Sequence, residues 1–184
     1  SLEEYKSVIN ALVPFILKAV KQPYLEINIS CPNTDTGKSL HDNLDELKTL
    51  LMFVREKTNC VTVVKVSPDA SNKNICTIAE LVKSFSFMTI NAGNTQLKTC
   101  ADVGLKKDRL AVGKGGVSGP KLFDRTLEMT QLLQPYNLPI IATGGITTAD
   151  QVFELLNSGA AIVGVATQLV KNPFSIKRMN LELA

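Results

Sequence analysis

The sequence has no tryptophan, a single histidine and no cysteine pair with CxxC spacing. Protein metal sites are usually built from closely spaced cysteines or from several histidines and carboxylates in recognisable patterns. Four scattered cysteines and one histidine do not form such a pattern, so we predict no metal site. We interpret His41 as a solvated loop residue. We interpret Cys60, Cys76 and Cys100 as packing or incidental thiols.

Long apolar runs and a strong excess of one charge are also missing. No run approaches the roughly 20 apolar residues that a membrane-spanning helix needs. Glu3 and Glu4 differ from the basic start of a signal peptide. The formal charge of +3 is small and evenly spread, whereas nucleic-acid-binding surfaces are strongly basic. We therefore expect a cytoplasmic protein that binds neither a membrane nor nucleic acid.

What remains is the composition of an ordinary globular domain. The 184 residues are 45% hydrophobic and 20% charged, and this length suffices for one sizeable core. We expect a single domain over residues 1–184.

Short apolar runs alternate with segments of helical period. Strands alternating with helices form parallel sheets with right-handed crossovers. The segment 94–118 shows neither pattern, and we expect it to be irregular and to serve a function or an interface. Helices are predicted at 2–21, about 43–57, 71–84, 120–133, 148–157 and in two pieces over 168–184, and strands at 24–30, 61–66, 87–90, 139–142 and 161–165.

Polar residues or glycines stand at the carboxyl end of every predicted strand. They are Cys31, Lys65, Asn91, Gly144 and Thr167. This one-sided placement is typical of the active face of a (β/α) barrel. A doubly wound open sheet also binds ligands at its strand ends, so the pattern alone leaves both folds open.

The first strand leads into a candidate general base. Cys31 follows the strand, and Asn28 and Asn33 flank it with amide side chains. Pro32 biases Cys31 toward extended geometry, so the thiol leaves the strand in a defined direction. A thiolate can take a proton near neutral pH if its pKa is lowered, and amides can orient a planar polar substrate.

The later strand ends suggest an anionic ligand. Lys65 is the only charge in the apolar run Val61–Val66. Its amine could form a Schiff base, as in barrel aldolases, or provide a fixed charge beside an electron-rich cofactor. Thr143-Gly144-Gly145 and Ala166-Thr167 end the last two strands, where phosphate-binding barrels place backbone donors.

Taken together in this order, six motifs resemble the dihydroorotate dehydrogenases. The resemblance covers essentially the whole chain, which matches the C-terminal five of the eight strand–helix units of a (β/α)8 TIM barrel. It implies an FMN enzyme of pyrimidine synthesis that oxidises dihydroorotate to orotate. The motifs are Asn28-Ile29-Ser30-Cys31-Pro32-Asn33-Thr34, Val64-Lys65-Val66, Ile90-Asn91, Gly115-Gly116-Val117-Ser118-Gly119, Ala142-Thr143-Gly144-Gly145-Ile146 and Val165-Ala166-Thr167.

The resemblance also implies roles for single residues. Cys31 is similar to the base of the soluble class 1 enzymes, which removes the C5 proton while the C6 hydride passes to flavin N5. Lys65 matches the lysine beside the flavin N1 and O2 edge. Substrate binding is implied for Asn28, Asn33 and Asn91. FMN binding is implied for Asn28, Lys65, Ser118, Gly119, Gly144, Gly145, Ala166 and Thr167.

Several alternatives stay open. Ala92 stands where the family usually has a serine or threonine that touches the substrate, which leaves room for an FMN barrel acting on another dihydropyrimidine. A second alternative is a phosphate-binding barrel lyase in which Lys65 forms an imine. A third is a non-catalytic remnant. Because the family's first three strands have no counterpart, we expect a fragment, or a barrel completed by a second polypeptide. The family implies a homodimer, with fumarate or an FAD and iron–sulfur subunit as electron acceptor.

Overall fold

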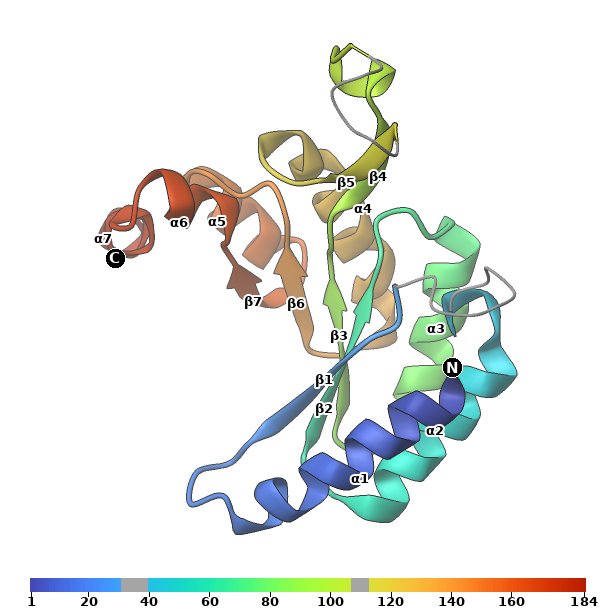
Figure 1. Ribbon diagram of the computed structural model, residues 1–184. Coiled ribbons are helices and arrows are strands. Elements are labelled where there is room, and N and C mark those ends of the chain that lie inside the picture. Colours follow the sequence, from blue (N-terminus) through green and yellow to red (C-terminus); the bar gives the residue numbers. More distant parts are fainter. Residues whose placement is uncertain (31–39, 107–112) are drawn as a thin grey trace.

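The computed structural model describes residues 1–30, 40–106 and 113–184. Within them, a five-stranded parallel sheet has the order β1-β2-β3-β6-β7 (Figure 1). This order confirms the predicted sequence of parallel strands. The strands are β1 (Tyr24–Asn28), β2 (Val61–Val66), β3 (Met88–Ala92), β6 (Ile140–Thr143) and β7 (Ala160–Gly164).

Helices separate the strands, as their apolar period predicts. Four α-helices begin at a polar cap whose side chain accepts a backbone N–H: Ser1, Asn43, Ser71 and Thr148. The α-helices are α1 (Leu2–Lys18), α2 (Leu44–Lys57), α3 (Asn72–Lys83), α4 (Phe123–Leu133), α5 (Ala149–Asn157), α6 (Thr167–Lys171) and α7 (Ser175–Leu183). The 3-10 helices are η1 (Leu40–Asp42), η2 (Ala101–Val103), η4 (Pro120–Leu122) and η5 (Gln134–Tyr136). No helix of the described ranges is long and apolar enough to cross a lipid bilayer.

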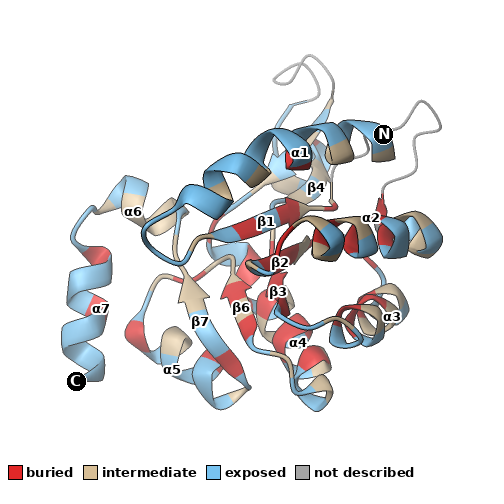
Figure 2. Cartoon of the chain, turned by 90° about the horizontal axis from the view of Figure 1, so that it is seen from below, coloured by how far each residue is buried: buried red, intermediate tan, exposed pale blue. Residues whose placement is uncertain are grey.

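The main core lies between one face of the sheet and its helices. Figure 2 shows α2, α3 and α4 along the same side of the strands, with buried residues where they meet. Burial of this apolar surface is the main stabilising contribution to the fold. Fully or almost fully buried members include Ile27, Val64, Ile90 and Ile140 from the strands and Leu50, Ile78 and Met129 from the helices.

The opposite face of the sheet carries the polar residues. The strand register places Asn28 beside Lys65, Lys65 beside Asn91, and Asn91 beside Ile141. Because side chains alternate along a strand, these residues point away from the helix-facing core. The same face also exposes apolar side chains: Tyr24, at the start of β1, is 67% exposed, and Ile162, in the middle of β7, is 57% exposed. The helix-free face is therefore both polar and incompletely covered.

The segment 94–118 is more regular than expected. β4 (Gln96–Thr99) and β5 (Lys114–Val117) form an antiparallel pair beyond the carboxyl end of the sheet (Figure 1). The prediction of an irregular segment was wrong for these residues because neither strand has an apolar run. The glycines of β5 also weaken its strand signal. Gly116 packs closely against Thr95, whose side chain would have to shift to make room for a Cβ there.

Candidate functional site

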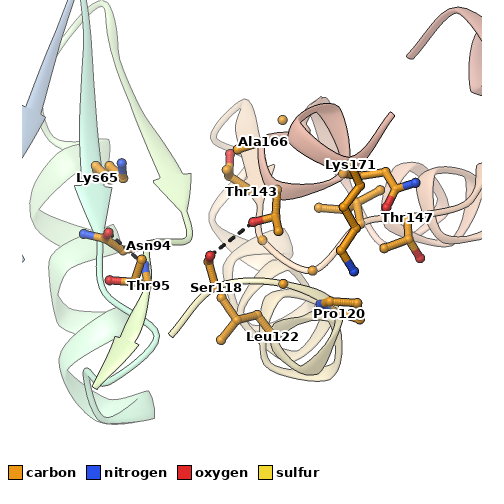
Figure 3. A pocket seen from close by; sticks show the side chains of 17 residues that line it. Lys65, Asn94, Thr95, Ser118, Pro120, Leu122, Thr143, Thr147, Ala166 and Lys171 are labelled. Carbon is orange, nitrogen blue, oxygen red and sulfur yellow. Dashed lines mark hydrogen bonds between the residues drawn. The ribbon is translucent and has the colours of Figure 1, made fainter. Parts of the chain in front are cut away.

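A cavity of about 160 Å³ lies at the carboxyl ends of β2, β6 and β7 and beside the β4–β5 hairpin (Figure 3). The parallel strands end at one edge of the sheet, so residues far apart in the sequence meet there. Seven residues predicted from the sequence line the cavity: Lys65, Ser118, Gly119, Gly144, Gly145, Ala166 and Thr167. Thr143, which belongs to the predicted Thr143-Gly144-Gly145 strand end, also lines it. Sequence reasoning missed five further lining residues: Asn94, Thr95, Thr147, Gln168 and Lys171.

Glycines shape the loop that follows β6. Gly144 and Gly145 have φ values of +134° and +78°, which residues with a Cβ rarely adopt. A Cβ at Gly145 would overlap the backbone of Phe123, at the start of α4. The loop therefore packs directly against α4, with its backbone exposed to the cavity on the other side.

Two hydroxyl groups meet across the cavity. The Thr167 hydroxyl, at the start of α6, donates to Ser118 Oγ at 3.2 Å. This contact joins the chain after β5 to the chain after β7 (Figure 3). Gly119, with φ +110°, lies beside them, and a Cβ there would have only Thr167 Cγ2 nearby, at 3.8 Å. The absence of a side chain leaves this part of the cavity open for a ligand.

The charge of the cavity is positive. Lys65 from β2 and Lys171 from α6 line it, and its described lining contains no aspartate or glutamate. Lys171 lies four residues after Thr167, so both occupy the same face of α6. That spacing is the signal by which Lys171 could have been found. Two cations, two hydroxyls and glycine backbone together favour an anionic ligand such as a phosphate.

Two of the three predicted amides, Asn28 and Asn91, lie beside this cavity. Asn91 is 6% exposed and does not line the cavity; its Nδ2 donates to Glu26 Oε2 at 2.9 Å. Asn28 Oδ1 accepts from Asn94 Nδ2 at 3.3 Å, and Asn94 does line the cavity. Glu26 Oε1 lies 3.9 Å from Lys65 Nζ. Glu26, which the sequence prediction passed over, thus connects Lys65 with Asn91.

Two predicted residues, Cys31 and Asn33, lie outside the described residues. Their roles stay predictions that rest on the sequence motif. Among the residues for which coordinates are described, no group of three histidine, cysteine, aspartate or glutamate side chains could hold a metal ion.

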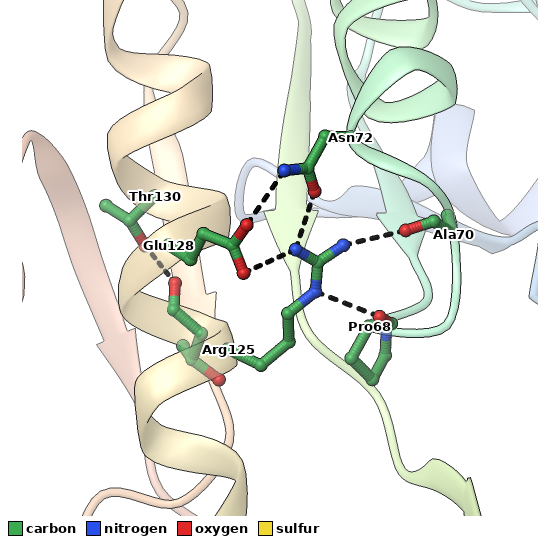
Figure 4. A network of polar contacts seen from close by, with 7 residues as sticks. Pro68, Ala70, Asn72, Arg125, Glu128 and Thr130 are labelled. Atoms are coloured by element: carbon green, nitrogen blue, oxygen red, sulfur yellow. Dashed lines mark hydrogen bonds and ion pairs between the residues drawn. The ribbon is translucent and has the colours of Figure 1, made fainter.

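A polar network holds the loop after β2 (Figure 4). Arg125 of α4 donates to Pro68 O at 3.0 Å and to Ala70 O at 2.7 Å. It also donates to Asn72 Oδ1 at 2.7 Å and to Glu128 Oε2 at 2.6 Å. The guanidinium therefore ties α4 to the loop that follows the strand of Lys65.

The same loop holds the β4–β5 hairpin. Asp69 Oδ2 accepts from the backbone N–H of Leu97 at 2.9 Å. The N–H of Asp69 in turn donates to Ser67 Oγ at 3.1 Å. α4, the β2–α3 loop and the hairpin are thus connected around the cavity.

We expect Arg125→Ala to lower the free energy of unfolding by about 2–3 kcal/mol. Hydrogen bonds to charged groups contribute roughly 1.5–3 kcal/mol each, but the partly exposed pair with Glu128 contributes less. The measurement is the midpoint of urea unfolding. Arg178→Ala is a matched control, because Arg178 forms an exposed ion pair with Glu182 on α7; its cost should stay under about 1 kcal/mol. Equal losses of unfolding free energy in the two variants would contradict the stabilising role assigned to the Arg125 network.

The Arg125 contribution should weaken in acid. Hydrogen bonds from Arg125 and then Asn72 lower the pKa of Glu128 from its ordinary 4.5. The resulting stabilisation is present above pH 4.5 and is lost as the pH falls through the lowered value. The difference in the free energy of unfolding between Arg125→Ala and the unmodified protein should therefore become smaller as the pH falls below 4.5.

The fold and the cavity define the class of protein. Parallel strands alternate with helices, and a glycine-rich cationic cavity lies at their carboxyl ends, which places the chain among the (β/α) barrel proteins. A sequence model described as dihydroorotate dehydrogenase matches residues 1–184. The chain belongs to the dihydroorotate dehydrogenase family.

Individual relatives agree with this assignment. The chain is 35% identical over 170 residues to "Dihydroorotate dehydrogenase (quinone)" of Kocuria rhizophila, covering 85% of this chain and 46% of the relative. It is 36% identical over 174 residues to "Dihydroorotate dehydrogenase B (NAD(+)), catalytic subunit" of Bacillus mycoides, covering 94% of this chain and 54% of the relative. The chain thus spans about half the length of the curated relatives that it matches.

A solved structure shows the same fold. The crystal structure of DHODH from Eimeria tenella in complex with ferulenol aligns with a TM-score of 0.80 at 20% sequence identity. The alignment covers 97% of this chain and 53% of that chain. The predicted fold, five βα units of a TIM barrel, is confirmed by this similarity.

Proposed function

We propose that the protein uses FMN to oxidise dihydroorotate to orotate in pyrimidine synthesis. One observation carries the proposal. In a chain of this family, residues from four separate motifs that were predicted to bind FMN line a single cationic cavity. The two curated relatives described above are named dihydroorotate dehydrogenases, which supports the same substrate.

The described residues fit the phosphate end of FMN. The cavity, at about 160 Å³, is smaller than the roughly 300–1,000 Å³ of sites that enclose a whole ligand. It therefore suits one end of a cofactor, and its glycines, its hydroxyls and Lys171 suit a phosphate group. When bound, FMN supplies the hydride acceptor for the oxidation. We propose that Ser118, Gly119, Gly144, Gly145, Ala166 and Thr167 hold its ribityl and phosphate portions.

Lys65 provides a fixed positive charge in this proposal. Its Nζ lies 3.9 Å from Glu26 Oε1, at the edge of the cavity. A fixed positive charge there stabilises an electron-rich ring. Membership of an oxidoreductase family argues against the lyase alternative.

The substrate is held by amides and deprotonated by a thiolate in the same proposal. Asn28, Asn33 and Asn91 bind the pyrimidine ring, and Cys31 takes the C5 proton. Asn28 and Asn91 lie on either side of Lys65 in the strand register, which supports a shared site. Ala92, the residue that left room for another dihydropyrimidine, is 0% exposed in the helix-facing core, so it gives that alternative no structural support.

We further propose that these βα units form the C-terminal part of a TIM barrel, in a protein that acts as a homodimer. The exposed apolar residues on the helix-free face support additional strands there. The relatives named above differ in their electron acceptors, quinone or NAD(+). Fumarate, or an FAD and iron–sulfur subunit, remains the acceptor implied by a class 1 cysteine.

The test is an absorption spectrum of the purified full-length protein under anaerobic conditions. A yellow flavin spectrum that bleaches with dihydroorotate, and far more slowly with dihydrouracil, is the expected result. Protein that takes up no FMN, or bound FMN that dihydroorotate leaves oxidised, would refute the proposal. Reoxidation by fumarate, a quinone or NAD(+) then identifies the acceptor.

A further inference from the structure

Glu26 contacts two proposed site residues and has no role in the function described so far. It lies on β1, on the helix-free face of the sheet, with a side chain that is 32% exposed. We propose that Glu26 is a positioning residue that orients the amide of Asn91, so that the Asn91 oxygen accepts an N–H group of the substrate ring. This inference rests on the proposed function.

Both oxygens of the Glu26 carboxylate are engaged. Oε1 lies 3.9 Å from Lys65 Nζ, and Oε2 accepts from Asn91 Nδ2 at 2.9 Å. Lys65 and Asn91 are neighbours in the β2–β3 register, so the two contacts hold the carboxylate from adjacent strands. The carboxylate is therefore hydrogen-bonded to Asn91 and lies close to the charge of Lys65.

The chemistry of a carboxylate decides which way the amide points. The oxygen and nitrogen of an asparagine side chain have the same shape, and only their partners distinguish them. A carboxylate can only accept hydrogen bonds, so the NH2 group of Asn91 must turn toward Glu26. The oxygen of Asn91 is then directed away from Glu26 and is left as the acceptor.

That acceptor has no partner in the described part of the chain. Asn91 Oδ1 is buried and makes no hydrogen bond there, although Asn91 is only 6% exposed. A buried acceptor without a partner is unfavourable and calls for an explanation. A ligand N–H would satisfy it, and the reduced and oxidised pyrimidine rings both carry such donors. Glu26 would thereby select a ring that presents an N–H at this position.

A double-mutant cycle tests the inference through the dissociation constant of orotate. The variants are Glu26→Gln, Asn91→Ala and both together in the FMN-loaded full-length protein, measured by titration calorimetry. Glutamine offers Asn91 either a donor or an acceptor, so the amide can turn over. Glu26→Gln should weaken orotate binding by up to about tenfold more in the Asn91 background than in the Asn91→Ala background, as expected for loss of one hydrogen bond between the ring and the Asn91 oxygen.

The cycle separates orientation from general charge. Removing a negative charge favours binding of the orotate anion in both backgrounds, so that effect cancels. Glu154→Gln is the control, because Glu154 is an exposed residue of α5, and it should leave the orotate affinity unchanged. If Glu26→Gln does not fold, Glu26→Asp replaces it, since the shorter side chain withdraws from Asn91 but keeps its charge.

The outcomes distinguish the two proposals. If the double variant weakens orotate binding by the product of the two single effects, within twofold, the positioning role is overturned. The proposed function still holds in that case if dihydroorotate bleaches the FMN of the unmodified protein. An unmodified protein that binds no orotate overturns both.

Discussion

A Cys31→Ala variant is expected to lose dihydroorotate oxidation by a factor of roughly 10² to 10⁴, the usual contribution of a general base. Alanine removes the only proposed acceptor for the C5 proton. The proposed FMN contacts are on other residues, at the ends of β1, β2, β5, β6 and β7. The variant should therefore still bind FMN. The measurement is the rate of anaerobic FMN bleaching after rapid mixing with dihydroorotate.

Two further variants make this result specific. Cys31→Ser should be slow near neutral pH and recover at higher pH, because a hydroxyl is a much weaker acid than a thiol. Cys60→Ala is the matched control, since Cys60 packs at the margin of the core and does not line the cavity. Bleaching of Cys31→Ala at a near-normal rate would remove Cys31 from the mechanism.

The sheet could be predicted from the sequence because its strands are buried. Val61–Val66 and Ile140–Thr143 have apolar residues on consecutive positions, and polar or glycine residues end both runs. The β4–β5 hairpin could not be found in this way. Its strands pair only with each other outside the core, so burial does not constrain their residues to be apolar.

The site residues that could be predicted are those at the ends of strands. Lys65, Gly144 and Thr167 follow directly from the rule that parallel strands end at one edge. Glu26 was missed because it lies inside a strand, where the sequence gives no sign that its carboxylate faces Lys65 and Asn91 across two strands. Lys171 was missed because the direction of the short helix α6 is set by tertiary packing.

Gly93→Ala is expected to destabilise the fold by about 3 kcal/mol or more, or to prevent folding. Gly93 directly follows β3, with φ +149°, and a Cβ there would overlap the backbone carbonyl of Thr143 on β6. A strained backbone costs about 1–3 kcal/mol and an overfilled contact about 1–3 kcal/mol more. The clash cannot be relieved by rotating a side chain, since both groups are backbone. Urea unfolding measures the loss.

Gly104→Ala is the control that measures the cost of backbone strain without a steric clash. Gly104 also has a positive φ, +72°, but a Cβ there would meet nothing within 4 Å. Its cost should be limited to about 1–2 kcal/mol for the left-handed conformation. Similar losses in both variants would mean that the contact with Thr143 is unimportant. Thr143 lines the cavity and leads into Gly144, so a Gly93→Ala protein that still folds should also bind FMN more weakly, whereas Gly104→Ala should not.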